Sequence, residues 1–184
     1  MSDIWVTSDS HFGHSKHFLY EPRGFKNIEE HDEAVIYNWN SLVKPDDIVY
    51  HLGDVMLNDD EHGLKCLQRL NGHIQMIRGN HDTNSRLFKY AECWNVESVG
   101  DWATVIKSGK QSIYLSHYPT ITSNYDIDKP LKARVINVCG HSHTKDPFAD
   151  WDKGLIFHCE LDTNNCKPWN LEDILKAIRK RLNE

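Results

Sequence analysis

The sequence lacks the segments that would direct it to a membrane or divide it into parts. No apolar run approaches the roughly 18 residues that a membrane-spanning helix needs. The first residues, MSDIWVTSDSHFGH, contain neither the basic stretch nor the apolar stretch of a secretory signal. No repeat, low-complexity tract or linker interrupts the chain. These absences predict one globular domain over residues 1–184, with no membrane partner, that starts at Met1 and works in the cytoplasm.

Paired cysteines are also missing. The five cysteines are odd in number, are far apart and form no CxxC motif. This pattern argues against a zinc knuckle and against a thioredoxin-type redox motif. Free thiols in a reducing compartment are the simpler interpretation.

An excess of positive charge is absent as well. The formal net charge is −6, which argues against a broad electrostatic grip on nucleic acid. A nucleic-acid partner therefore stays open but is not favoured. Divalent cations bound by some of the acidic residues would make that site locally positive. The net charge of the chain therefore does not define the sign of the charge in a cleft.

The hydrophobic pattern alternates between strands and helices in the first half of the chain. Strand-like runs cover 4–8, 47–52 and 73–78, and helical patterns cover 27–42, 61–70 and 86–90. In the second half, strand-like runs cover 96–99, 102–107, 111–116, 134–139 and 155–161, before an amphipathic helix over 171–182. This order predicts a mixed α/β fold with helices on the outside, and it is consistent with two facing sheets.

Histidine is abundant, with twelve residues, and polar clusters follow five of the expected strands. Their residues are Asp9 and His11, Asp54, Asn80 to Asp82, His117, and His141 with His143. Ligand sites in open α/β sheets collect where strands end, so the clusters predict one convergent site. Its three oxygen donors and four imidazoles exceed one four-coordinate shell and suit two divalent ions. Without a thiolate, such a set favours Mn, Fe, Zn or Ni.

The ordered motifs DxH, GD, GNHD, H and GHxH resemble the calcineurin-like metallophosphoesterase superfamily. The resemblance covers residues 9–143 and extends to the flanking elements. The DSHFGH opening and the SHYP segment are similar to a group of small stand-alone bacterial and phage phosphoesterases. The resemblance implies an αββα sandwich, in which two facing mixed β-sheets are flanked by helices.

The resemblance also implies a role for each motif position. One ion would be held by Asp9, His11 and His143. The other would be held by Asn80, His117 and His141. Asp54 would bridge the two ions, and a hydroxide activated by them would attack phosphorus.

The general acid implied by the resemblance is His81, which would contact the phosphate and protonate the leaving alcohol. Asp82 would orient its ring. Many relatives have a second Asp three residues after the bridging one, where this chain has Leu57. That difference weakens the support around the site but leaves the ligand set complete.

Two further residues are candidates for substrate contact. His14 lies three positions after His11. For this residue, substrate contact is slightly favoured over a structural role. Arg23 could clamp phosphate, or it could anchor its loop through an ion pair. Other histidines, namely His17, His31 and His62, are expected to face solvent. Asp162 follows the last expected strand, but a place in the site is not predicted for it.

A small phosphodiester is the favoured substrate class, because the chain has no cap domain and the cleft should be open. Phosphomonoesters and nucleoside polyphosphates stay open, since the same metal core serves all three. The polar loop 119–132 is the candidate for a specificity lid. A non-catalytic interaction module, like the small subunit of the retromer coat, is the alternative from another class; the intact His81 argues against it. The oligomeric state stays undetermined.

Overall fold

The computed structural model describes residues 2–122 and 130–183. A five-stranded sheet has the order β4-β3-β2-β1-β9. Its strands are β1 (Ile4–Thr7), β2 (Ile48–His51), β3 (His73–Met76), β4 (Val96–Val99) and β9 (Trp169–Asn170). The first four run parallel, and β9 pairs antiparallel with β1. The segments that leave β1, β2 and β3 therefore emerge at the same edge of the sheet.

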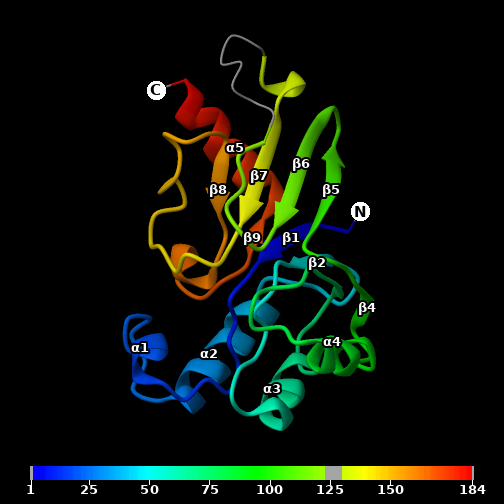
Figure 1. The fold of residues 1–184 in the computed structure, drawn as a ribbon, viewed down its shortest axis with the longest axis vertical. Coiled ribbons are helices and arrows are strands. Elements are labelled where there is room, and N and C mark those ends of the chain that lie inside the picture. Colours follow the sequence, from blue (N-terminus) through cyan, green and yellow to red (C-terminus); the bar gives the residue numbers. More distant parts are fainter. Residues whose placement is uncertain (1, 123–129, 184) are drawn as a thin grey trace.

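A second sheet has four strands in the order β5-β6-β7-β8 (Figure 1). They are β5 (Ala103–Ser108), β6 (Gln111–Ser116), β7 (Val135–Cys139) and β8 (Ile156–His158). The pair β5–β6 is an antiparallel hairpin, whereas β6, β7 and β8 run parallel. Both sheets are mixed, as the predicted fold class requires.

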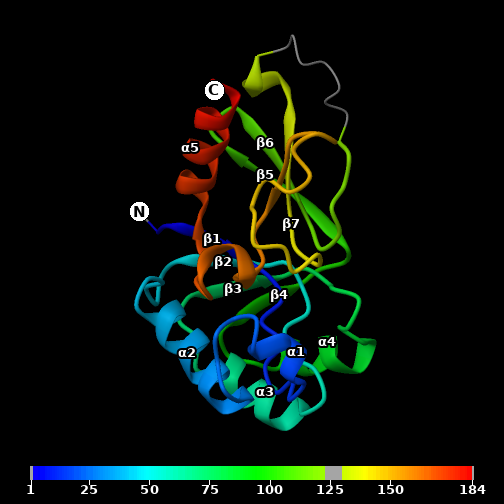
Figure 2. The same ribbon diagram turned by 90° about the vertical axis from the view of Figure 1, so that its left-hand side faces the viewer.

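Helices flank the two sheets (Figure 2). In that view α2 (Ile28–Asn40), α3 (Asp60–Leu67) and α4 (Asn84–Ala91) lie below the five-stranded sheet. The C-terminal α5 (Leu171–Leu182) stands above it, beside the four-stranded sheet. These four helices begin at side-chain caps, which accept a backbone N–H of the first turn. The caps are Asn27, Asp59, Thr83 and Asn170.

Two hydrophobic cores hold these layers together. The first lies under the helices, where Trp39, Leu67 and Tyr90 pack with strand residues such as Ile74. The second joins the sheets and α5, and its members include Val6, Leu52, Ile113, Val138, Phe157, Ile174 and Ile178. Because the second core clamps one sheet to the other, the strand ends of both sheets are brought to a common place. The fold class predicted from sequence is confirmed.

Several details differ from the expectation. The expected strand over 155–161 is the shorter β8, followed by a 3-10 turn at Leu161–Asn164. The four-residue α1 (His17–Tyr20) and the two-residue β9 were not predicted, because elements this short carry too little periodic pattern. All five cysteines are free and buried. None of the helices in 2–122 and 130–183 combines the length and apolar character needed to cross a bilayer. Of the proposed lid 119–132, residues 123–129 lie outside the described residues.

Candidate metal centre

Most of the candidate ligands sit on left-handed backbone immediately after strands. Their positive φ angles are 58° at Asp9, 48° at His11, 56° at Asp54, 75° at His141 and 49° at His143. Side-chain-bearing residues rarely adopt this region, and strained backbone of this kind clusters at functional sites. The turns aim these side chains back across the strand ends instead of along the strands.

Two glycines let the ligand loops approach each other closely. A Cβ atom on Gly79 would lie 2.5 Å from the backbone nitrogen of Asp54 and 2.9 Å from its carboxyl carbon. A Cβ atom on Gly140 would collide with the Ser8 hydroxyl and with Asp9 Oδ2. Any larger residue would push these carboxylates away, so both positions require glycine for packing reasons.

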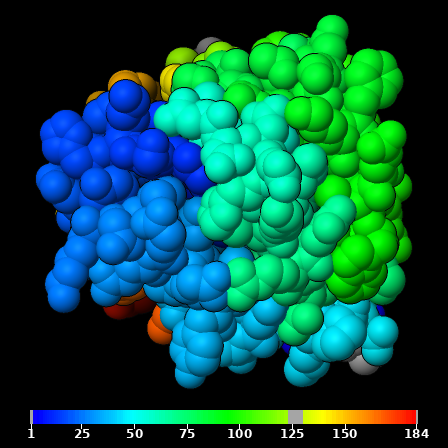
Figure 3. Space-filling model, turned by 90° about the horizontal axis from the view of Figure 1, so that it is seen from below, coloured from blue at the N-terminus to red at the C-terminus, as the bar shows by residue number. Residues whose placement is uncertain are grey.

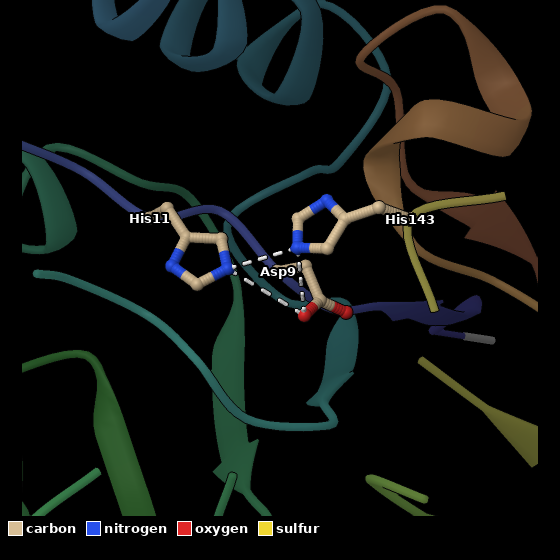
Figure 4. Close-up of side chains that lie close together, drawn as sticks. All are labelled: Asp9, His11 and His143. Carbon is tan, nitrogen blue, oxygen red and sulfur yellow. Dashed lines mark hydrogen bonds and ion pairs between the residues drawn. The ribbon is translucent and has the colours of Figure 1, made fainter. Parts of the chain in front are cut away.

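Asp9, His11 and His143 converge from two distant segments of the chain (Figure 4). The Nε2 atoms of the two histidines are 3.2 Å apart, and each lies 3.7 Å from Asp9 Oδ1. That carboxylate oxygen is buried without a hydrogen-bond partner. Burial lowers the pKa of His11 to about 4, so its ring is neutral at pH 7. An unpartnered oxygen facing imidazole nitrogens is a donor set that fits a divalent cation.

A second group is formed by Asp54, Asn80 and His117. His117 Nε2 lies 2.8 Å from Asn80 Oδ1 and 3.6 Å from Asp54 Oδ2. His117 Nδ1 lies 2.8 Å from the Leu52 carbonyl oxygen, which can only accept, so the ring proton is on Nδ1. In the neutral ring, Nε2 then offers a lone pair toward the amide and carboxylate oxygens. Three electron-pair donors facing one another fit a cation between them.

His141 completes this second group from the loop after β7, the strand beside the one that precedes His117. Its ring centroid lies 5.0 Å from that of His117, and its backbone N–H donates to Asp9 Oδ2 at 2.8 Å. The His141 loop is therefore tied to the first group while its ring stands beside the second. All seven candidate ligands predicted from sequence lie in this one region.

Asp54 stands between the two groups. Its Oδ2 lies 3.8 Å from His11 Nε2 and 3.6 Å from His117 Nε2, a placement suited to a bridging ligand. Burial and the nearby negative charge of Asp9 raise the pKa of Asp54 to about 7. Two buried carboxylates this close repel each other when both are ionised. Divalent cations would relieve that repulsion, so the electrostatics also fit a metal centre.

His81 is held firmly by its backbone, and its side chain is 45% exposed. Its N–H donates to Asp54 Oδ1 at 2.8 Å, and its carbonyl accepts from Arg86 Nη1 at 2.7 Å. Its Nε2 lies 3.9 Å from Asp54 Oδ2. The imidazole therefore borders the candidate centre and faces solvent, where a substrate would enter.

Asp82 does not have the role assigned to it from sequence. Its Oδ2 accepts the backbone N–H groups of Asp54 and Gly79, at 2.7 and 2.8 Å. Its Oδ1 accepts the Tyr90 hydroxyl at 2.8 Å. This carboxylate therefore joins the two ligand-bearing loops, whereas the expected hydrogen bond to the His81 ring is replaced by these contacts.

Arg23 lies behind the centre as an anchor. Its guanidinium donates to Asp162, to the Asp9 carbonyl and to His31 Nε2, and its side chain is only 1% exposed. This arrangement favours the loop-anchor interpretation over the phosphate clamp. It also corrects the expectation for His31, which is fully buried because the Arg23 loop folds over α2.

Asp162 is a site residue that sequence reasoning missed. Its Oδ2 lies 3.0 Å from His143 Nδ1 and 2.7 Å from Arg23 Nη2. Because a carboxylate accepts, a proton is held on His143 Nδ1, so Nε2 is the ring nitrogen left to bind an ion beside Asp9. Its position directly after the strand expected over 155–161 was the signal that could have indicated it.

The substitution Asp162→Asn is expected to weaken divalent-ion affinity at the His143 group by about 10–100-fold. An amide can present its NH2 group to His143 and so favour the wrong tautomer. Isothermal titration with Zn²⁺ after chelation measures the change, with circular dichroism as the check on folding. The exposed Asp173→Asn on α5 is the matched control. Unchanged affinity in folded Asp162→Asn would remove Asp162 from the centre.

His14 lies at the rim of the candidate centre, with its ring 5.7 Å from that of His11. Asn58 Nδ2 lies 3.2 Å from His14 Nδ1 and can donate to it. This contact favours the tautomer with its proton on Nε2, which makes His14 a hydrogen-bond donor at the rim. The arrangement suits contact with an anionic oxygen, and the role of His14 stays a prediction.

Comparison with known proteins agrees with the family resemblance of the sequence motifs. Residues 3–158 match the family model described as the calcineurin-like phosphoesterase superfamily domain. An uncharacterised protein of Methanocaldococcus jannaschii is 32% identical over 186 residues, which cover 98% of this chain and 93% of that protein. The gene 66 protein of Mycobacterium phage L5 is 30% identical over 165 residues, with 78% and 79% coverage.

Solved structures share the fold. A protein of unknown function from Aquifex aeolicus has a TM-score of 0.72 and 24% identity, over 96% of this chain and 100% of that one. An archaeal phosphodiesterase has a TM-score of 0.50 and 20% identity, over 85% and 82% of the two chains. At these identities the likeness shows a common architecture. The family model also spans the positions of all seven candidate ligands.

Proposed function

Since the chain belongs to the calcineurin-like phosphoesterase superfamily, we propose that it hydrolyses a small phosphodiester with the help of two divalent ions. The observation that carries the proposal is the position of Asp54 Oδ2, within 4 Å of His11 Nε2 on one side and His117 Nε2 on the other. One ion would be held by Asp9, His11 and His143. The other would be held by Asn80, His117 and His141. Asp54 would be shared by both.

When bound, the ions would supply Lewis-acid stabilisation of charge on the phosphoryl oxygens and favour deprotonation of water. The remaining tasks fall to the chain. His81 would donate a proton to the departing alcohol oxygen, from a ring whose backbone is fixed by Asp54 and Arg86. His14 would donate a hydrogen bond to a phosphoryl oxygen.

A phosphodiester suits the charge of this site better than a phosphomonoester. A monoester carries a second negative charge, which a free guanidinium would help to neutralise. Arg23 is the guanidinium that the sequence suggested for this purpose, and Asp162 and His31 already occupy it. An exposed His81 also leaves room for a second ester group on phosphorus.

The protein loaded with Mn²⁺, Ni²⁺ or Zn²⁺ is expected to hydrolyse bis(p-nitrophenyl) phosphate at least about tenfold more efficiently than p-nitrophenyl phosphate. Steady-state kcat/KM for the two substrates measures this preference. Removal of the ions with a chelator should abolish turnover, and their return should restore it. A preference for the monoester would indicate a phosphomonoesterase. Absence of turnover with all three metals would favour a non-catalytic module on this fold.

A further inference from the structure

A second cluster of metal-ligating side chains lies between α2 and α3, and it shares no residue with the candidate metal centre. Asp32 comes from α2, and His62 and Cys66 come from one face of α3, four residues apart. Their donor atoms all lie within 4.8 Å of one another. His62 Nε2 is 2.9 Å from Asp32 Oδ2 and 3.4 Å from Cys66 Sγ. Three different helical positions thus converge on one point.

The surroundings of this cluster combine burial with a route to solvent. Asp32 and Cys66 are each 1% exposed, whereas the His62 side chain is 38% exposed. A hollow of about 480 Å³ opens beside His62, and its lining includes Gly13 and Asp59. Seen from below, α2 and α3 present neighbouring surfaces to solvent (Figure 3). An ion could therefore reach His62 from solvent and be enclosed by the two buried donors.

The buried negative charge of Asp32 also favours a cation in this cluster. The partners recorded for the Asp32 carboxylate in the described part of the chain are the Gly13 amide and the rings of His31 and His62. No lysine or arginine is among these partners, and a buried carboxylate without a full positive charge is costly. Burial, reinforced by the charge of Asp32, raises the pKa of the Cys66 thiol to about 12. The thiol therefore carries its proton at pH 7, and a bound metal ion would displace it.

We propose that Asp32, His62 and Cys66 form a separate site for a single zinc ion, or for another divalent ion that accepts sulfur. One carboxylate oxygen, one imidazole nitrogen and one thiolate are zinc ligands in proteins. Three protein ligands would leave a fourth position for water or another small ligand. The ion would replace the proton between His62 Nε2 and Asp32 Oδ2, and it would fasten α3 to α2.

Cobalt(II) titration of the full chain tests this site without reference to catalysis. A cobalt–thiolate bond gives a near-ultraviolet charge-transfer band, and the seven ligands of the candidate metal centre contain no sulfur. The wild-type protein is expected to show the band, and excess Zn²⁺ should remove it. In Cys66→Ser the band should fall below about a tenth of its wild-type intensity. Cys93→Ser, which removes another buried free thiol, is the matched control and should keep the band.

His62→Gln provides a second test that leaves the thiol in place. It is expected to weaken cobalt affinity, read from the same band, by at least about tenfold. Circular dichroism establishes that each variant is folded. No band in the wild-type protein, or an undiminished band in folded Cys66→Ser, would overturn the proposal. In that case the cluster is a hydrogen-bonded clamp between α2 and α3.

Discussion

Asp54→Asn is expected to remove both ions of the candidate metal centre together and to lower kcat/KM at least about a thousandfold. The reason is the position of Oδ2 between His11 and His117, which makes this atom common to both ligand groups. Asparagine has nearly the same shape but offers one neutral oxygen in place of two charged ones. Elemental analysis of the metal-loaded, desalted protein measures the ions retained.

The same substitution should make the metal-free protein more stable at high pH. The folded-state pKa of Asp54 is raised from 3.8 to about 7 by burial and by the charge of Asp9. A raised pKa on an acid means that ionisation disfavours the folded state. The penalty is absent below pH 4, grows as the pH rises toward 7 and is complete above that value. Asparagine removes it, so the midpoint of thermal unfolding in chelator should rise by about 5 °C at pH 8.

The contrast between pH 4 and pH 8 separates this effect from a general change in packing. At pH 4 the two midpoints should nearly coincide, because Asp54 is protonated in the folded state and still about half protonated in the unfolded state, so little of the penalty has developed. The exposed Asp46→Asn is the matched control and should change neither the metal content nor the unfolding midpoint. Retention of two tightly bound ions by Asp54→Asn would refute the bridging role.

His81→Asn is expected to lower kcat by about 10²–10⁴-fold for a phosphodiester with an alkyl leaving group. An alkoxide leaves poorly unless it is protonated, and asparagine cannot supply a proton. The backbone contacts of His81 with Asp54 and Arg86 do not involve its side chain. Both ions should therefore stay bound, which elemental analysis would establish.

A p-nitrophenolate leaving group distinguishes a general acid from a residue that only binds substrate. That anion is stable near neutral pH, so its departure needs little protonation. The loss for bis(p-nitrophenyl) phosphate should then be about tenfold or less. An equal loss for the two leaving groups would contradict the acid role. His17→Asn, at an exposed histidine of α1, is the matched control.

The sequence predicted the family and the fold class because both depend on local patterns. The ligand motifs lie within a few residues of strand ends, and short apolar runs in the sequence indicate the strands. Asp162 and Arg23 illustrate what such patterns omit. Their ion pair joins positions 139 residues apart, and it depends on the tertiary packing that returns the chain to the end of β1, where Ser8 pairs with Glu160. A polar residue in a loop gives no local sign of such a partner.

His31 and Asp82 were also misinterpreted. His31 lies four residues before Val35 and eight before Trp39, so it shares the buried face of α2, where it contacts Arg23 and Asp32. The expectation of a solvent-facing ring overlooked this spacing. Asp82 follows His81 directly, yet its oxygens bond Asp54 and Tyr90 instead. For Asp82, sequence proximity predicted one neighbour, and tertiary packing supplied others.

The left-handed backbone at five candidate ligands has an evolutionary consequence. Each such residue costs about 1 kcal/mol or more relative to a relaxed conformation, and glycine would adopt the same φ angles with little penalty. Random substitution at these positions can therefore gain stability while it destroys the ligand set. Without selection for catalysis, such substitutions would be tolerated, and they would give an inactive but more stable protein. At these five positions the protein therefore carries a local cost in stability together with its candidate ligand side chains.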